Sequence, residues 1–180
     1  MTVWFTADTH FGSQRTLELS RRPFKDTHTM DNDIFSWWIA LFEPGDVLYH
    51  LGDFGEFERA MGWLKYKGVT CHLILGNYEE DAISSGEYTR EDLLDMGFAS
   101  VNNSLHIPEL DGIFAVHRPE DCDKRPGAFN IFGHIHGRQT VKRYGLDVGV
   151  DAHHFRPVSA DDVFWYKNAI ENHYDENVFD

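Results

Sequence analysis

The chain has 180 residues, which is enough for one domain with a hydrophobic core and too few to favour a second independent domain. Hydrophobic residues make up 42% of it and aromatic residues 14%, a composition that argues against a disordered chain. The formal net charge of -14 disfavours sequence-independent binding along a nucleic-acid backbone, whereas it would attract divalent cations.

Cysteine usage and the first residues bear on location. Cys71 and Cys122 form neither a disulfide framework nor a metal-binding spacing. The segment from Met1 to Asp8 has no basic region and no long apolar stretch. We therefore expect a cytoplasmic protein with no secretory signal and no membrane anchor.

The first half of the chain is predicted to alternate strands with helices. Apolar and β-branched runs predict strands over residues 2–7, 46–51 and 69–75. Helical spacing of apolar residues predicts helices over residues 29–42, 56–67 and 89–96. We expect Thr29 or Asp31 to cap the first helix, and the basic stretch 15–25 to form a long loop with room for one helical turn.

The second half is richer in strands. Apolar runs predict strands over residues 100–107, 112–116 and 128–132, followed by a further hairpin arm within 139–150. Ser159 is expected to cap a last helix that ends near Ile170. Alternation followed by strand-rich sequence predicts an α/β fold, in which two sheets pack together with helices outside. Because no internal repeat or linker interrupts it, the chain 1–180 is expected to form a single domain.

The segment from Gly133 to Gly137 contains two histidines, His134 and His136, directly after the predicted strand 128–132. Side chains two residues apart on an extended backbone point the same way, and flanking glycines let the chain turn closely around a ligand. Ligands bind at the carboxyl ends of strands in α/β sheets. The alternative is a pair of ordinary turn histidines, and this motif alone leaves both interpretations open.

Residues of metal-ligand type also follow the other predicted strands. The full set of candidates is Asp8, His10, Asp53, Asn77, His117, His134 and His136. Any one of them is an ordinary turn or capping residue, but seven in five clusters predict a metal site. Mixed imidazole and carboxylate ligands suit manganese, iron or zinc. Seven ligands are too many for one catalytic ion with an open position, and they suit two ions that share a carboxylate.

The order of these clusters resembles the motif series of the calcineurin-like metallophosphoesterase superfamily. The matching segments are Asp8-Thr9-His10, Gly52-Asp53, Gly76-Asn77-Tyr78-Glu79, the lone His117, and Gly133-His134-Ile135-His136. Three further stretches, at 9–12, 22–24 and 49–54, resemble the small, compact bacterial, archaeal and phage members. The resemblance spans nearly the whole chain and implies a four-layer α/β/β/α sandwich, in which two mixed sheets are flanked by helices.

The resemblance also implies the role of each ligand. One ion would be bound by Asp8, His10 and His136, the other by Asn77, His117 and His134, and Asp53 would bridge them. The ions would be divalent or trivalent, with manganese expected first and iron, zinc or nickel as alternatives. Two ions roughly 3.5 to 4 Å apart lower the pKa of a bridging water toward neutrality, and the resulting hydroxide attacks phosphorus in line with the leaving oxygen.

One position departs from the family pattern. Tyr78 stands where the family usually has a histidine that helps to stabilise the transition state or to protonate the leaving group. A tyrosine, with an ordinary pKa of about 10, donates a hydrogen bond but carries no positive charge at neutral pH. A monoester with a poor leaving group should suffer most, so we expect a phosphodiesterase with weak monoesterase activity. The alternative is that Tyr78 only packs beside the site.

The substrate is less defined. Arg118, next to a candidate ligand, and Arg22, after the first motif, are candidates to bind the substrate's phosphate, with a surface salt bridge as the alternative for each. We expect a small phosphate ester or nucleotide rather than extended nucleic acid, because no basic stripe with interleaved aromatic residues occurs. The alternatives are a monoesterase, a DNA nuclease of the same superfamily and a non-catalytic metal-binding scaffold, and the oligomeric state stays open.

Overall fold

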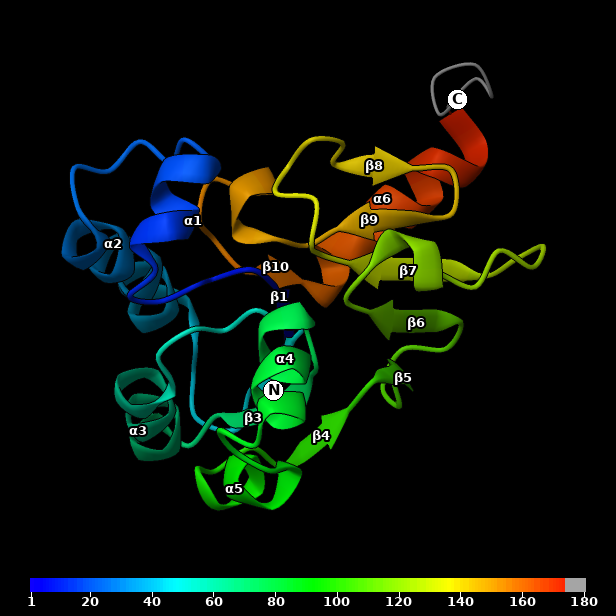
Figure 1. The fold of residues 1–180 in the computed structure, drawn as a ribbon. Coiled ribbons are helices and arrows are strands. Elements are labelled where there is room, and N and C mark those ends of the chain that lie inside the picture. Colours follow the sequence, from blue (N-terminus) through cyan, green and yellow to red (C-terminus); the bar gives the residue numbers. More distant parts are fainter. Residues whose placement is uncertain (174–180) are drawn as a thin grey trace.

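A computed structural model describes residues 1–173, which form two mixed five-stranded sheets packed face to face (Figure 1). In order across the first sheet, the strands are β10 (Val158–Ser159), β1 (Val3–Thr6), β2 (Val47–His50), β3 (Thr70–Ile74) and β4 (Ser100–Asn102). The second sheet consists of β5 (Ser104–His106), β6 (Ile113–Val116), β7 (Phe129–Phe132), β9 (Gly145–Asp147) and β8 (Val141–Lys142). The central strands of both sheets are parallel, and β10, β5 and β8 pair antiparallel at the edges.

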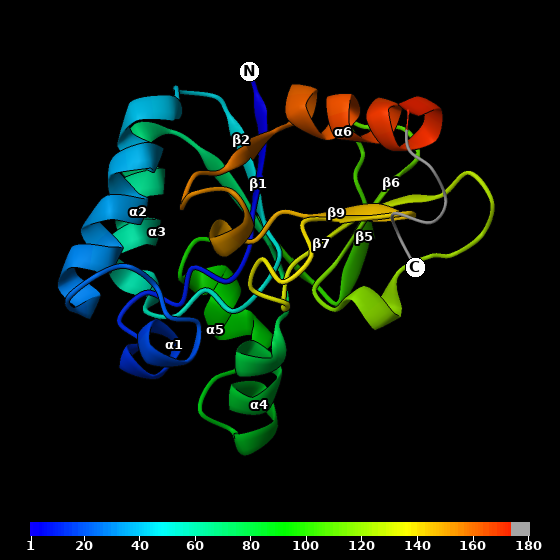
Figure 2. The same cartoon turned by 90° about the horizontal axis from the view of Figure 1, so that it is seen from above.

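Six α-helices flank the sheets in the described part of the chain. They are α1 (Gln14–Leu19), α2 (Thr27–Leu41), α3 (Phe57–Lys67), α4 (Asn77–Ser85), α5 (Arg90–Asp95) and α6 (Ala160–His173). Figure 2 shows α2 and α3 together outside the first sheet and α6 beside the second sheet. Short 3₁₀ turns occupy Pro119–Asp121 and Val150–Ala152. The expected sandwich of two packed mixed sheets with flanking helices is confirmed.

The period-2 alternation of the strands divides the apolar side chains between two cores. Phe5 and Tyr49 face the second sheet, where their rings stack with centroids 5.7 Å apart. The intervening Leu48 faces the other way and packs among helical residues such as Trp38, which is fully buried. Burial of both faces is what parallel strands require, and it explains why these strands read as nearly continuous apolar runs.

Three helical predictions need correction. The stretch expected as a loop contains α1, whose first turn is stabilised by Ser13, because the hydroxyl of this residue accepts from the Thr16 amide. Asp26, not Thr29 or Asp31, caps the next helix, and its carboxylate accepts from the Thr29 amide at 2.7 Å. Helix α4 was not predicted. Its buried residue is the charged Glu79, so its sequence shows no apolar periodicity.

The predicted strand over residues 100–107 is two strands that belong to different sheets. Ser100–Asn102 pairs with β3 and Ser104–His106 pairs with β6, so the chain crosses from one sheet to the other at Asn103 (Figure 1). Val101, Leu105 and Ile107 keep one phase of alternation on both sides of the crossing, so the pattern predicts a single strand that includes the polar run Asn102-Asn103-Ser104 between them. The two-residue strand Val158–Ser159 was also not predicted, although Ser159 does cap α6 by accepting from the Asp162 amide at 3.1 Å.

The parallel strands determine where the loops that carry polar residues meet. Strands β1, β2 and β3 run in one direction through the first sheet, and β6 and β7 run in parallel through the second. The segments that follow them therefore converge at one edge of the sandwich. No helix within residues 1–173 is both long and apolar enough to span a membrane.

Candidate metal centre

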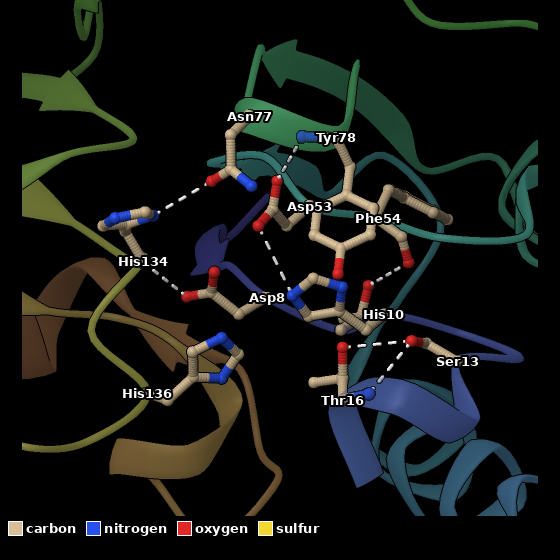
Figure 3. A network of polar contacts seen from close by, with 12 residues as sticks. Asp8, His10, Ser13, Thr16, Asp53, Phe54, Asn77, Tyr78, His134 and His136 are labelled. Carbon is tan, nitrogen blue, oxygen red and sulfur yellow. Dashed lines mark hydrogen bonds and ion pairs between the residues drawn. The ribbon is translucent and has the colours of Figure 1, made fainter. Parts of the chain in front are cut away.

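All seven candidate ligands gather at this edge. Figure 3 shows Asp8, His10, Asp53, Asn77, His134 and His136 close together. The seven ligands follow five strands: Asp8 and His10 come after β1, Asp53 after β2, Asn77 after β3, His117 after β6, and His134 and His136 after β7. Five clusters that are far apart in sequence thus meet in one small volume.

One group of ligand atoms belongs to Asp8, His10 and His136, and these atoms all lie within 4.8 Å of one another. The rings of His10 and His136 stack with centroids 5.3 Å apart. Asp8 is held in place through its second oxygen, which accepts from the His134 amide at 2.8 Å. A carboxylate and two imidazoles at this spacing can converge on one ion.

A second group comprises Asp53, His117 and His134, whose ligand atoms also lie within 4.8 Å of one another. The side-chain oxygen of Asn77 joins them, 3.1 Å from His117 Nε2 and 3.0 Å from His134 Nδ1. The same two ring nitrogens are 3.2 Å apart. Two imidazoles, an amide oxygen and a carboxylate therefore form a second candidate binding site.

Asp53 lies between the two groups. Its Oδ2 atom is 3.4 Å from His10 Nε2 on one side and 3.6 Å from His117 Nε2 on the other. Its Oδ1 atom accepts from the Tyr78 amide at 3.0 Å, which fixes the orientation of the carboxylate. A carboxylate in this position can contribute to both sites.

The backbone at the ligands is strained. Five of the seven have a positive φ, namely Asp8 (57°), His10 (48°), Asp53 (57°), His134 (72°) and His136 (49°). For a residue with a side chain, the left-handed region costs roughly 1–2 kcal/mol relative to the right-handed one. Such strain concentrates where the fold fixes a functional geometry, and here it directs five side chains toward a common point.

Two glycines make room for the carboxylates. A Cβ atom at Gly76 would lie 2.3 Å from Asp53 Oδ1, and one at Gly133 would lie 2.5 Å from Asp8 Oδ2. Neither distance leaves space for a side chain, so both motifs need glycine for close approach rather than for an unusual φ.

The buried ligands fit a cation in their chemistry. Within the described chain, Asp8 Oδ1 and His10 Nε2 are buried and lack a hydrogen-bond partner, a state that costs free energy unless something else satisfies them. Burial, together with the nearby charge of Asp53, raises the pKa of Asp8 well above its ordinary value. Burial also lowers the pKa of His10, and that of His117 to about 4, which favours the neutral imidazole that binds metals.

Groups behind the ligands orient the imidazoles. His117 Nδ1 donates to the carbonyl oxygen of Leu51 at 2.6 Å, which leaves Nε2 for an ion. His136 Nδ1 lies 2.7 Å from Asp151 Oδ2, with the same consequence for its ring. Such outer partners set the tautomer and direction of a ligating histidine. Asp151 was not predicted from the sequence. A signal was present nearby, because Asp147 ends β9 just as other candidate ligands follow the ends of their strands.

Glu79 organises the two loops that carry Asp53 and Asn77. It is 1% exposed, and its carboxylate accepts from the amides of Asp53, Phe54 and Gly76, each at 2.8 Å. Three amide donors offset the free energy of burying a carboxylate there. The acid in this motif therefore supports the ligands instead of facing the cavity.

The two arginines proposed to bind phosphate differ. Arg22 is buried behind the site, where its guanidinium donates to Asp151 and to the carbonyl oxygens of Asp8 and Thr9. It does not face the cavity, so the prediction that it binds a substrate's phosphate needs correction. Arg118 lies beside His117 and forms a 2.7 Å ion pair with Glu80, in agreement with the alternative of a salt bridge.

A cavity of about 370 Å³ opens over the ligands. Tyr78 stands at its wall, 38% exposed, with its ring edge-on to His10 at a centroid distance of 4.8 Å. The Tyr78 hydroxyl accepts a hydrogen bond of 2.6 Å from Arg15, and Arg21 and Arg138 line the same cavity. These three arginines were missed from the sequence, because none stands in a motif and each comes from a loop or a short helix.

Comparisons with known proteins agree with this geometry. A family model described as calcineurin-like phosphoesterase matches residues 1–173. The gene 66 protein of Mycobacterium phage L5 is 26% identical, over 98% of each chain. The crystal structure of a protein of unknown function from Aquifex aeolicus has the same fold, with a TM-score of 0.68 at 20% identity, over 91% of this chain and 98% of that one.

Proposed function

The chain belongs to the calcineurin-like phosphoesterase family, and we propose that within it the protein is a dinuclear metal-dependent phosphodiesterase with weak monoesterase activity. Membership implies a metal-dependent hydrolase of phosphoric esters, and the two groups of candidate ligands agree with it. The preference for diesters is our proposal, and it depends on Tyr78.

Each candidate ligand has a role in this proposal. Asp8, His10 and His136 would hold one ion, Asn77, His117 and His134 the other, and Asp53 both. When bound, two such ions supply Lewis acidity to the phosphoryl oxygens and lower the pKa of a water molecule toward neutrality. Mixed nitrogen and oxygen donors accept several transition metals, and manganese is our first choice.

The position of Tyr78 is the observation that carries the diester preference. Its ring packs against His10, and its hydroxyl accepts from Arg15 at the wall of a cavity that Asp53 and Asn77 also line. There it can donate a hydrogen bond to an oxygen of the substrate, since Arg15 donates to it and leaves its own proton free. It cannot act as a neutral-pH cation in the way that a protonated histidine can.

This difference separates two classes of ester. Hydrolysis of an alkyl monoester dianion expels an alkoxide, which is a poor leaving group. The reaction therefore depends strongly on proton delivery and on positive charge near the leaving oxygen. A diester has one negative charge fewer to neutralise, and an anhydride releases a stable phosphate. A site with a neutral hydroxyl at this position should therefore favour diesters or anhydrides. The expected substrates are small phosphate esters or nucleotides.

Hydrolysis of matched aryl esters tests the proposal. Metal-stripped protein would be reconstituted with manganese and assayed on an aryl phosphodiester and on the corresponding monoester, with Asp53→Asn as the inactive control. We expect metal-dependent cleavage that favours the diester and disappears in the control. A monoester rate equal to or above the diester rate would overturn the preference while keeping the metal centre, and an inactive protein would favour a metal-binding scaffold.

A further inference from the structure

We propose that Arg15, Arg21 and Arg138 form a subsite for a second phosphate group of the substrate, so that the natural substrate is a small ester with two phosphates. The proposal deepens the function given above and rests on it. It concerns the outer part of the cavity, which the candidate metal ligands do not reach.

The three arginines share a cavity with the candidate ligands. Arg15 lies in α1, Arg21 follows the end of that helix, and Arg138 lies in the loop after His136. All three are exposed, and the cavity they line has Asp53 and its neighbouring ligands as its floor. A substrate whose scissile phosphate sits over the candidate metal centre would therefore extend past them.

No carboxylate of the described chain neutralises the charge of these three arginines, although the protein is strongly acidic. Acidic residues outnumber basic ones by 30 to 16, and Arg22, Arg118 and Arg125 each form ion pairs with them. Among the described residues, no ion pair joins a carboxylate to any of the three cavity arginines, and Arg15 instead donates to the Tyr78 hydroxyl. Three guanidinium groups without carboxylate partners form a basic site in an acidic protein, and guanidinium groups suit bidentate binding of phosphate.

Arg21 also occupies a position that favours glycine. Its amide donates to the Glu18 carbonyl oxygen and the Arg22 amide donates to that of Leu17, which together make a Schellman ending to α1. Arg21 is the left-handed residue of this motif, with a φ of 52°. An arginine there is strained where a glycine would not be, so stability does not explain its presence. Binding of an anion does.

The number of free cations at the cavity favours a small substrate with a second phosphate over an extended polyanion. The candidate metal centre would neutralise the scissile phosphate, so three further cations need another anionic group to pair with. Most of the remaining basic residues of the described chain are paired with acids or packed on rings elsewhere, for example Lys67 with Glu43 and Arg156 over Trp37. An extended polyanion would lack contacts beyond the cavity.

Two matched thymidine diesters test the subsite. One is thymidine 5′-(4-nitrophenyl phosphate), and the other is the same compound with a 3′-phosphate. We expect a kcat/KM at least about tenfold higher for the phosphorylated compound, as charge-assisted hydrogen bonds to one phosphate provide. This ratio should fall toward one in Arg21→Gly and in Arg138→Gln, and should persist in Lys65→Gln, which removes an exposed cation outside the cavity.

Arg21→Gly separates binding from folding. Glycine relieves the left-handed strain, so the Tm of this variant should rise by about 2 to 4 °C while the substrate preference falls. A variant that kept the preference, or a wild-type protein that treated both diesters alike, would overturn the subsite. A kcat/KM that rose with every nucleotide added to an oligothymidylate would overturn the assignment to a small substrate.

Calorimetry distinguishes failure of the subsite from failure of the proposed function. Manganese-loaded protein would be titrated with thymidine 3′,5′-bisphosphate and with thymidine 5′-monophosphate. The bisphosphate should bind at least about tenfold more tightly, and Arg21→Gly should remove the difference, whether or not the aryl diesters are hydrolysed. Equal affinities would reject the subsite even if diesterase activity were established.

Discussion

The guanidinium of Arg22 and the carboxylate of Asp151 meet through two hydrogen bonds, 2.9 Å from Nε and 2.8 Å from Nη2. Asp151 Oδ2 also lies 2.7 Å from His136 Nδ1. Arg22 therefore connects the first loop to a candidate ligand of the second sheet. It is a positioning residue, and it acts through Asp151.

Replacement of Arg22 should destabilise the protein strongly. Arg22→Met removes the cation and leaves the buried Asp151 carboxylate with His136 as its remaining partner. Loss of one partner of a buried ion pair typically costs about 3–5 kcal/mol of unfolding free energy. Urea unfolding of the metal-free variant would measure this loss. Arg125→Met is the matched control, because the Arg125 side chain is exposed in its pair with Asp123, and its unfolding curve should overlay that of the wild type. A loss equally small in both variants would contradict the role given to Arg22.

Tyr78→His should raise the rate on an unactivated phosphomonoester by about tenfold or more, since it restores a side chain that can be a cation and an acid. The diester rate should change less, and the measurement is kcat/KM on both esters with manganese. Tyr78→Phe is the control that keeps the ring contact with His10 and removes the hydroxyl. If the phenylalanine variant matched the wild type on both esters, Tyr78 would only pack beside the site.

Manganese should stabilise the metal-stripped protein. An ion that binds only the folded state adds about 2.7 kcal/mol per site when its concentration is a hundred times its Kd. Asp8→Asn should reduce this gain, because Asp8 Oδ1 is a buried atom without a partner that the ion would satisfy. Thermal unfolding with and without manganese measures the effect. Asp161→Asn, an exposed acid of α6, should retain the full gain.

Acid should destabilise the protein in part through His50. Burial lowers the pKa of His50 to about 3, against about 6.5 in the unfolded chain. The contribution of neutral His50 to the free energy of unfolding is complete above pH 6.5 and declines as the pH falls toward 3. At pH 5 it is smaller by about 2 kcal/mol. His50→Gln, which can keep the bond to the Thr9 hydroxyl, should lose correspondingly less stability between pH 7.5 and 5. The exposed His28→Gln should decline like the wild type, and an unchanged slope in His50→Gln would reject the assignment.

The candidate ligands could be named from the sequence, whereas the residues that support them could not. Asp8, His10 and Asp53 could be recognised because each follows an apolar strand in a motif of fixed spacing. Asp151 could not, because its meaning depends on a contact with Arg22 across 129 residues. Side-chain direction at such a distance is decided by tertiary packing.

The same limit explains the missed elements of the fold. Helix α4 buries only Glu79, and its other side chains are half-buried or exposed, so no apolar period marked it. The division at Asn103 follows from strand pairing, which a one-dimensional alternation does not encode. Arg21 looked like one more charge in a basic loop, and only its backbone conformation distinguishes it.

Both candidate ligand groups draw on both sheets. Asp8 and His10 of the first sheet face His136 of the second, and Asp53 of the first faces His117 and His134 of the second. Any ion held by either group would therefore cross-link the two sheets at their interface. The sheets must dock before such an ion can bind, and the ion then opposes their separation. The metal-loaded protein should therefore unfold more slowly than the metal-free protein.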